Sequence, residues 1–533
     1  MMKIKRKSKV LHRAAATTLA LGLLLPTLAA AASAPVPIRE TAKSMGAEVT
    51  WDQKGRTITV QKGADKLVFT VGKDTALLNG KTVSIGDKVT IVSNQALVPA
   101  SLLNQLLGGT EVADSKDALF LAALQQGNGE EALRYVSPAL KKAVTAAELQ
   151  SFWQSYEQAL GKIGNPISQS TTKDAVHTNV TTIFQAGQSS LKLIMRLNAA
   201  GEVDDLFINL VQPEAYQKPA YDVETNYTEQ EITIGQGEFV LPGTLTLPKG
   251  EGPFPAVVLV HGSGMNDRDE TIGGAKPLRD LAVGLAAEGI AVLRYDKVTY
   301  QHTVKIASDP KLTLKRETAD DALAAVKLLK TSKSIDSSQI YVIGHSQGGF
   351  AVPLMTSHDT AGDIAGAVLL AAPSGKFGEV LVEQQHDVIA RMKELNMDTT
   401  ANEQNAAMIE EIVKTINDPK YSVDQLPEQF PLQPAYWFFE SRDYKAAELA
   451  AKQQLPLLIL QGENDFQVSM KQFNDWKSAL KERQNVQFKS YPKMNHLLSA
   501  YDGISVGAEY YSPSNVEIEL IQDIAKWIKD KNN

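Results

Sequence analysis

The chain has 533 residues, of which 43% are hydrophobic and 22% charged, and its formal net charge is −7 at pH 7. This length exceeds that of one ordinary domain, since about 150 residues per domain is typical. The composition is that of a globular protein with a large core, and it excludes a disordered chain, a collagen and a membrane protein with several spans. The acidic balance argues against nucleic acid as a partner.

The first 32 residues have the pattern of a secretory signal peptide. Six basic residues between Lys3 and Arg13 precede a leucine-rich apolar run that ends in alanines. A basic start, an apolar middle and a small-residue end are typical of an export signal; Pro26 interrupts the run, which makes an uncleaved membrane anchor the less favoured alternative. Cleavage after Ala32 would remove six positive charges and no acid, so the net charge would change from −7 to −13. We expect a secreted or cell-surface protein.

The chain contains no cysteine. Disulfides, thiolate metal sites and cysteine nucleophiles are therefore excluded, and an exported protein of this kind must derive its stability from packing alone.

Residues 36–115 are predicted to form a small α+β module with an internal repeat. A Val-Pro pair opens each copy, at Val36 and Val98, and alternating strands are expected at 57–60 and 66–71. The stretches VPIRETAKSMGAEVTWD, NGKTVSIG and ALVPASLLNQLLG resemble the copper amine oxidase N-terminal-like stalk domain of exported bacterial proteins. No histidine lies in the segment, so it offers no imidazole metal site. Attachment at the cell surface and a passive folding unit both remain open as its function.

Residues 117–212 are predicted to form a second small α+β domain. Apolar positions at helical spacing are followed by alternating strands, with helices expected at 118–125, 130–136 and 146–162 and strands at 179–184, 190–197 and 205–210. The segment resembles the small domain of unknown function, of cystatin or NTF2-like build, that often precedes exported hydrolases. We interpret the aromatic stripe of Phe152, Trp153 and Tyr156 as core, with a pocket lining as the alternative.

A polar linker at 213–228 leads to a third domain at 229–531. An opening hairpin is followed by strands that are hydrophobic throughout and alternate with helices, which is typical of a parallel sheet covered on both faces. We therefore predict a doubly wound, mostly parallel α/β domain, with strands at 256–260, 291–293, 340–343, 367–370, 457–460 and 486–488 and helices at 277–288, 318–329 and 516–527.

A Gly-x-Ser-x-Gly motif follows the predicted strand at 340–343. Ser346 stands at its centre, between Gly344 and Gly348, and a helix is expected to follow. A serine at the tip of so sharp a turn needs neighbours without a Cβ atom, so that strand and helix can approach closely. Ser346 is therefore the predicted nucleophile.

A serine nucleophile needs a histidine base and a carboxylate that orients this base. His496 is the candidate base because it lies in a loop just after the last predicted strand. Asp465 is the preferred acid because it follows a buried strand and a glycine turn, which produces the chain order serine, aspartate, histidine. Glu463, in the same turn, is the rival.

Acyl transfer also needs N–H donors for the oxyanion of the tetrahedral intermediate. The backbone N–H of Gln347, just after the nucleophile, is one expected donor. The loop after the strand at 256–260 should supply the other, from Ser263 or alternatively Gly264. The charged stretch 266–270 could order this loop by ion pairing or face the substrate, and a solvated turn is the favoured interpretation.

Four motifs, HGSGMNDRDE, GHSQGG, GENDFQV and NHLL, together resemble the α/β-hydrolase superfamily, nearest the exported esterases grouped with dienelactone-hydrolase-like and serine-aminopeptidase-like members. The resemblance covers about residues 225–531. It implies an α/β-hydrolase fold with a helical lid at about 375–452 and the roles of nucleophile, base and orienting acid for Ser346, His496 and Asp465. The aromatic residues at 436–439 would line an acyl pocket or pack the lid onto the core.

The predicted function is that of an exported serine hydrolase that cleaves carboxylic esters through an acyl-enzyme intermediate. Its substrate would be a small-molecule ester, or a short peptide if the same triad serves a serine peptidase or aminoacyl hydrolase. A cell-surface binding protein with an inactive hydrolase scaffold is the alternative from another class. No cofactor, metal or nucleic acid is expected to bind.

Overall fold

The computed structural model describes residues 36–39, 42, 47–63, 65–84, 88–92, 95–98, 115–211 and 215–530. The predicted signal peptide at 1–32 lies outside these residues. The chain divides into two compact units, with the boundary after Val211. Within the described ranges, no helix has the length and apolarity that crossing a bilayer requires.

The first domain consists of two small antiparallel sheets. One has the order β1-β8-β7, from Val36–Pro37, Gln95–Val98 and Thr90–Val92, and the other runs β2 to β6 in sequence. Val36 pairs with Val98, so the first residues of the two copies of the repeat are neighbours in one sheet. The strands expected at 57–60 and 66–71 are confirmed as β3 and β4 of the second sheet. The bounds in that sheet are β2 Glu48–Asp52, β3 Thr57–Lys62, β4 Asp65–Thr70, β5 Thr75–Leu78 and β6 Lys81–Ser84.

The second domain packs helices against an antiparallel sheet of order β12-β11-β10-β9. Its longest helix, α7, begins with a capping box in which Thr145 accepts from the N–H of Glu148 and Glu148 accepts from that of Thr145. Phe152, Trp153 and Tyr156 on α7 are buried, so the stripe is core as interpreted. The bounds are α4 Lys116–Gln125, α5 Gly129–Ala132, α6 Leu140–Ala143, α7 Ala146–Leu160, β9 Ile163–Lys173, β10 Thr178–Ala186, β11 Ser189–Leu197 and β12 Val203–Leu210.

Strand β9 was not predicted, and its position explains why. It is an edge strand whose residues are mostly polar and exposed, so it lacks the alternation that marks a half-buried strand. It also contains Pro166, which pairs with Phe184 at a register shift, where a missing N–H is tolerated.

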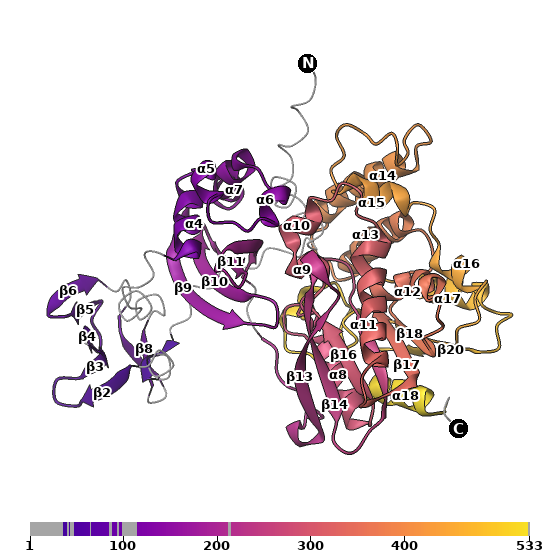
Figure 1. The fold of residues 1–533 in the computed structure, drawn as a ribbon, viewed down its shortest axis with the longest axis horizontal. Coiled ribbons are helices and arrows are strands. Elements are labelled where there is room, and N and C mark those ends of the chain that lie inside the picture. The colour runs from indigo at the N-terminus through magenta and orange to yellow at the C-terminus, as the bar shows by residue number, and fades with distance from the viewer. Residues whose placement is uncertain are drawn as a thin grey trace. The chain divides into compact units, whose positions relative to one another are not determined.

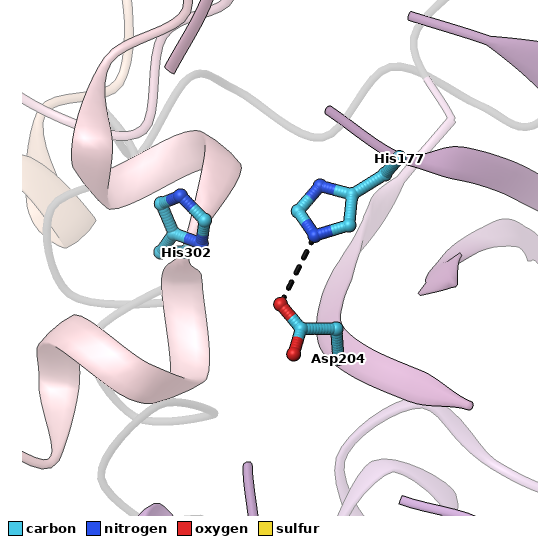
Figure 2. A group of neighbouring side chains, drawn as sticks. All are labelled: His177, Asp204 and His302. Atoms are coloured by element: carbon cyan, nitrogen blue, oxygen red, sulfur yellow. Dashed lines mark hydrogen bonds and ion pairs between the residues drawn. The ribbon is translucent and has the colours of Figure 1, made fainter. Parts of the chain in front are cut away.

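Buried histidines hold backbone segments in both units. His177, between β9 and β10, places its Nε2 atom 3.0 Å from Asp204 Oδ2 on β12 (Figure 2). His302, also drawn in Figure 2, belongs to the third domain, where its Nε2 atom lies 2.8 Å from the carbonyl oxygen of Val240. Each histidine is therefore engaged within its own unit.

The described part of the third domain contains an eight-stranded sheet of order β13-β14-β16-β15-β17-β18-β19-β20 (Figure 1). Its first two strands form the predicted antiparallel hairpin, and β14 also runs antiparallel to β16. All later neighbours are parallel, which confirms the predicted α/β class. The bounds are β13 Tyr227–Ile234, β14 Leu241–Pro248, β15 Phe254–Val260, β16 Ala291–Tyr295, β17 Ile335–His345, β18 Gly366–Leu370, β19 Leu457–Gly462 and β20 Val486–Tyr491.

The central strand β15 is hydrophobic throughout because its two faces enter different cores. Val257 and Leu259 pack with α8 and α18, whereas Ala256, Val258 and Val260 pack with the helices of the opposite face. One face is covered by α8 Pro277–Ala287 and α18 Ile518–Asp530. The opposite face is covered by α11 Asp320–Lys330, α12 Gln347–His358 and α17 Met470–Ala479.

The segment predicted as the lid lies between β18 and β19. Its helices α13 Phe377–Glu394, α14 Thr400–Asn417 and α15 Ala435–Glu440 lie together at one end of the domain in Figure 1. The fourth helix, α16 Ala446–Ala450, packs instead against α12 and α17. The N-terminal half of the domain contributes further short helices close to the end of β16, namely α9 Val298–Gln301, α10 Thr303–Ala307 and the π-helix η3 Lys315–Ala319.

Replacement of Trp476 by alanine should destabilise the third domain strongly. The indole is fully buried on α17, and its N–H donates to the carbonyl of Ala372 at 2.9 Å. Loss of so large a core side chain costs about 3–5 kcal/mol of unfolding free energy, which urea unfolding followed by tryptophan-independent circular dichroism would measure. Lys481→Ala, at an exposed position after the same helix, is the control and should change stability by less than about 0.5 kcal/mol.

Candidate active site

Ser346 occupies the sharp turn between β17 and α12. Its backbone has φ 52° and ψ −118°, a conformation that residues with side chains rarely adopt. Its N–H donates to the carbonyl of Leu370 at 2.9 Å, at the end of the neighbouring strand β18. The strained serine, with a strand before it and a helix after it, has the geometry of a nucleophile elbow.

The glycines of the motif are required by close backbone contacts. A Cβ atom on Gly344 would lie 2.4 Å from the carbonyl carbon of Gly348, and one on Gly348 would lie 2.3 Å from the carbonyl oxygen of Val260. A side chain at Gly344 would push α12 away from β17, and one at Gly348 would push it away from the end of β15, so the motif sets the position of the serine.

His496 and Asp465 meet at the ends of β20 and β19. The two atoms His496 Nδ1 and Asp465 Oδ2 are 2.7 Å apart, and both side chains are buried. The other carboxylate oxygen of Asp465 accepts from the N–H groups of Gln467 and Val468 at 2.7 and 2.9 Å. The rival Glu463 is exposed and accepts instead from the hydroxyl of Ser490. Asp465 is therefore the carboxylate that contacts the imidazole.

The loop of His496 is attached to the elbow through the neighbour of the serine. The Nε2 atom of His345 lies 2.9 Å from the carbonyl oxygen of His496, and the two rings are 4.8 Å apart. Among the hydrogen bonds of the described residues, none joins the Ser346 hydroxyl to the His496 ring. Such bonds commonly tighten only when substrate is bound.

A buried ion pair stands behind the elbow. His345 Nδ1 lies 2.9 Å from one carboxylate oxygen of Glu270, and the other oxygen accepts from the N–H of Gly262 at 2.6 Å. Burial alone disfavours both charges, but the opposite charge and the hydrogen bond outweigh it, so the pKa of His345 is raised and that of Glu270 is lowered. The favoured interpretation of 266–270 as a solvated turn is wrong for Glu270, because the elbow covers it; ion pairing orders this loop.

The expected oxyanion donors lie on one cavity. Ser263, Gly264 and Gln347 are among the residues that line a cavity of about 130 Å³. In the described part of the chain, the backbone N–H groups of Ser263 and Gln347 donate to no protein acceptor. They remain available to a bound group, as does the N–H of the alternative donor Gly264, whose φ is 102°.

The remaining walls of the cavity are mostly apolar. They come from α9, α10, the lid helix α15 and the start of α13, and include Ile306, Leu312, Phe377, Trp437 and Phe438. Phe439 packs instead against Phe430 and Tyr421 inside the lid. Within the stretch 436–439, Trp437 and Phe438 thus line the cavity, whereas Phe439 packs inside the lid.

Lys297 and Glu317, two residues that no sequence pattern marks, form a buried ion pair beside this cavity. Lys297 Nζ lies 2.8 Å from Glu317 Oε1, and Glu317 is one of the lining residues. Neither residue belongs to a motif, and they come from different elements, the loop after β16 and η3. Only the tertiary structure brings them together.

Two family models match this chain. Residues 26–118 match the copper amine oxidase N-terminal domain, and residues 252–500 match serine aminopeptidase S33. Esterase EstD of Thermotoga maritima is 34% identical over 419 residues, which cover 78% of this chain and 95% of that protein. These matches confirm both family resemblances that the motifs carry.

Solved structures with similar folds include further esterases. Est1E from Butyrivibrio proteoclasticus is 16% identical, with coverage of 57% of this chain and 98% of its own and a TM-score of 0.37. Esterase Pf2001 from Pyrococcus furiosus is also 16% identical, with coverage of 60% and 97% and a TM-score of 0.36. At such values neither structure informs the details of the site.

Replacement of Glu270 by glutamine should weaken the fold in a pH-dependent way. The pKa of His345 is raised, so its contribution to stability is complete below about pH 6.5 and is lost as pH rises through the raised value. The pKa of Glu270 is lowered, so its contribution is complete above about pH 4.5 and is lost as pH falls through the lowered value. The variant should therefore lose most unfolding free energy between about pH 4.5 and pH 6.5, namely about 3–5 kcal/mol, and should lose less at alkaline pH.

Urea unfolding of both proteins across a pH series would measure this difference. Glu463→Gln removes the same charge from an exposed side chain of the same domain and should shift stability by less than about 0.5 kcal/mol. A deficit in Glu270→Gln that does not vary with pH would contradict the ion pair.

Proposed function

This chain belongs to the esterases of the α/β-hydrolase superfamily, and we propose that it cleaves carboxylic esters outside the cytoplasm through a Ser346-His496-Asp465 triad. The observation that carries the proposal is the 2.7 Å contact between His496 Nδ1 and Asp465 Oδ2, in a loop attached to the strained elbow of Ser346. Nucleophile, orienting acid and base thereby follow one another in the chain order usual for this fold.

In the acylation half, the Ser346 hydroxyl oxygen attacks the ester carbonyl while its proton passes to His496 Nε2. Asp465 accepts a hydrogen bond from Nδ1–H, which sets the tautomer and stabilises the imidazolium. The oxyanion accepts from the N–H groups of Ser263 and Gln347. When the intermediate collapses, the bond to the alcohol oxygen breaks and His496 returns the proton to that leaving group.

In the deacylation half, water replaces the alcohol. His496 takes a proton from this water, whose oxygen attacks the carbonyl of the acyl-enzyme, and the same N–H donors bind the second oxyanion. Collapse releases the carboxylic acid and returns the proton to Ser346. The residues that hold the proton are the same in both halves, so no cofactor is needed.

The cavity supports an uncharged acyl group of limited size. Its volume of about 130 Å³ is close to that of an engineered apolar cavity of about 150 Å³ that binds benzene. Walls such as Trp437 and Phe438 favour an apolar group. The proposed substrates are small-molecule esters whose acyl group has about six carbons, in a chain or a ring.

The same cavity argues against an aminopeptidase. Recognition of a free N-terminal amine calls for an uncompensated carboxylate, and Glu317 is the carboxylate in the cavity wall. Its charge is already balanced by Lys297 at 2.8 Å. Arg442, near the lid, donates to the carbonyls of Ile416 and Tyr421 and so supports the lid rather than a peptide terminus.

Export is proposed from the basic and apolar pattern of residues 1–32. Contact with the cell surface through the copper amine oxidase N-terminal domain is part of the same proposal. Immunodetection of the full chain in cell, wall and medium fractions, beside a variant that lacks residues 1–32, would test it. Equal retention of both proteins in the cytoplasm would contradict export.

Ser346→Ala should lower kcat for p-nitrophenyl esters by about 10⁶-fold, because the acyl-enzyme can no longer form. Asp465→Asn should lower it by about 10⁴-fold, since the amide favours the wrong histidine tautomer. Glu463→Gln is the matched control and should retain wild-type kcat. Initial rates at saturating substrate and labelling of Ser346 by a fluorophosphonate would measure these effects.

A wild-type protein that hydrolyses no p-nitrophenyl ester and is not labelled at Ser346 by the fluorophosphonate would contradict the proposed function. A preference for aminoacyl p-nitroanilides over esters would instead assign the triad to a peptidase. Loss of activity in Glu463→Gln, with wild-type activity in Asp465→Asn, would assign the role of the orienting acid to Glu463.

Turnover of p-nitrophenyl esters should be highest for acyl groups of up to about six carbons, including benzoyl, and should fall for decanoyl. Trp437→Ala enlarges the cavity and should move the optimum to longer chains. Phe439→Ala removes a neighbouring aromatic ring that does not line the cavity, so it should leave the optimum unchanged. An unchanged optimum in Trp437→Ala would show that acyl groups bind elsewhere.

A further inference from the structure

We propose that Lys297 is a positioning residue that aligns the two N–H donors of the oxyanion hole. The inference rests on the proposed function, because it concerns the donors assigned there to Ser263 and Gln347. It adds a residue that neither touches the substrate nor belongs to a motif.

The ammonium group of Lys297 is buried and fully engaged. The side chain is 2% exposed, and Nζ donates to the carbonyl of Gly262 at 2.9 Å and to Gln347 Oε1 at 2.9 Å. Its third neighbour is Glu317 Oε1 at 2.8 Å. An ammonium has three N–H donors, so these acceptors use all of them and fix the group in one orientation.

The contact with Gly262 acts on the N–H of Ser263 through one peptide group. The carbonyl of Gly262 and the N–H of Ser263 belong to the same planar trans peptide and so point in opposite directions. A bond that anchors the carbonyl therefore also sets the direction of the N–H. A charged donor on the carbonyl oxygen polarises the peptide as well, which makes its N–H a better donor.

The contact with Gln347 joins this peptide to the other donor. Gln347 is the first residue of α12, and its backbone N–H is the second proposed oxyanion donor. The backbone of Gly348 already touches the carbonyl of Val260, so the two segments are close. One ammonium thus connects the loop and the helix, and it holds their N–H groups in a fixed relation.

Glu317 makes the buried cation tolerable. An isolated ammonium in the interior would be strongly disfavoured, whereas a paired one with every donor satisfied is not. Glu317 is 8% exposed and comes from the π-helix η3. Its charge balances that of Lys297, so the pair places no uncompensated charge on the cavity.

The test compares Lys297→Met with wild type and with Lys305→Met. Methionine keeps the length of the side chain and removes the donors. Lys305 is also buried but donates to the carbonyl of Glu238 rather than to the oxyanion segments, so its replacement controls for the loss of a buried lysine. Steady-state kinetics on p-nitrophenyl hexanoate and inhibition by a hexyl trifluoromethyl ketone, whose adduct carries an oxyanion, provide the readouts.

Lys297→Met should lower kcat by about 10- to 100-fold, somewhat less than removal of an oxyanion donor itself, with KM within about twofold of wild type. Its affinity for the trifluoromethyl ketone should fall by a similar factor. Lys305→Met should change neither quantity by more than about twofold. A smaller folded fraction would lower the apparent kcat but not the affinity of the folded enzyme for the trifluoromethyl ketone, so the inhibitor separates alignment of the donors from a general loss of stability.

An Lys297→Met enzyme that folds and keeps wild-type kcat and inhibitor affinity would overturn the inference. Gln347→Leu provides the second test, because it retains both backbone N–H groups and removes one acceptor of Lys297. If Lys297→Met does not fold, an unchanged kcat in Gln347→Leu would overturn the inference. Failure of the fluorophosphonate to label wild-type Ser346 would instead refute the proposed function, so the two failures are distinguishable.

Discussion

The site depends on the approach of α12 to the end of β15. The backbone of Gly348 touches the carbonyls of Val260 and His261 so closely that no side chain could be inserted. This contact brings Gln347, at the start of the helix, next to the loop that carries Ser263. It also forces Ser346 into its strained turn. The positions of the proposed nucleophile and of both proposed oxyanion donors are thus linked by a single steric constraint.

Two buried ion pairs connect the segments near that contact. Glu270 with His345 holds the oxyanion loop to the strand before the serine, and Lys297 with Glu317 holds it to the helix after the serine. A buried pair contributes little net stability, because desolvation offsets most of the attraction. Its directional hydrogen bonds nevertheless discriminate between arrangements, and here they select one arrangement of the loop and the elbow.

The lid has a structural role besides forming a cavity wall. Arg391 on α13 donates to the carbonyls of Asn464 and Asp465, at 3.1 and 3.2 Å. The loop of the orienting acid is therefore supported from the lid as well as from its own strand. A change in the lid would therefore act on the carboxylate of Asp465 as well as on the shape of the cavity.

Local patterns in the sequence determined the class of the fold, the strand order in the chain and the residues that meet at the site. Hydrophobic runs predicted the buried strands, and the glycines around Ser346 predicted the elbow, because both signals depend only on neighbours in sequence. The polar edge strand β9 escaped prediction because it buries little. The strand and glycine turn before Asp465 already favoured it over Glu463, and the structure agrees; the burial of Glu270 and the meeting of Lys297 with Glu317 were decided by the tertiary structure alone. Each of these depends on distances between segments far apart in the chain, which no local pattern encodes.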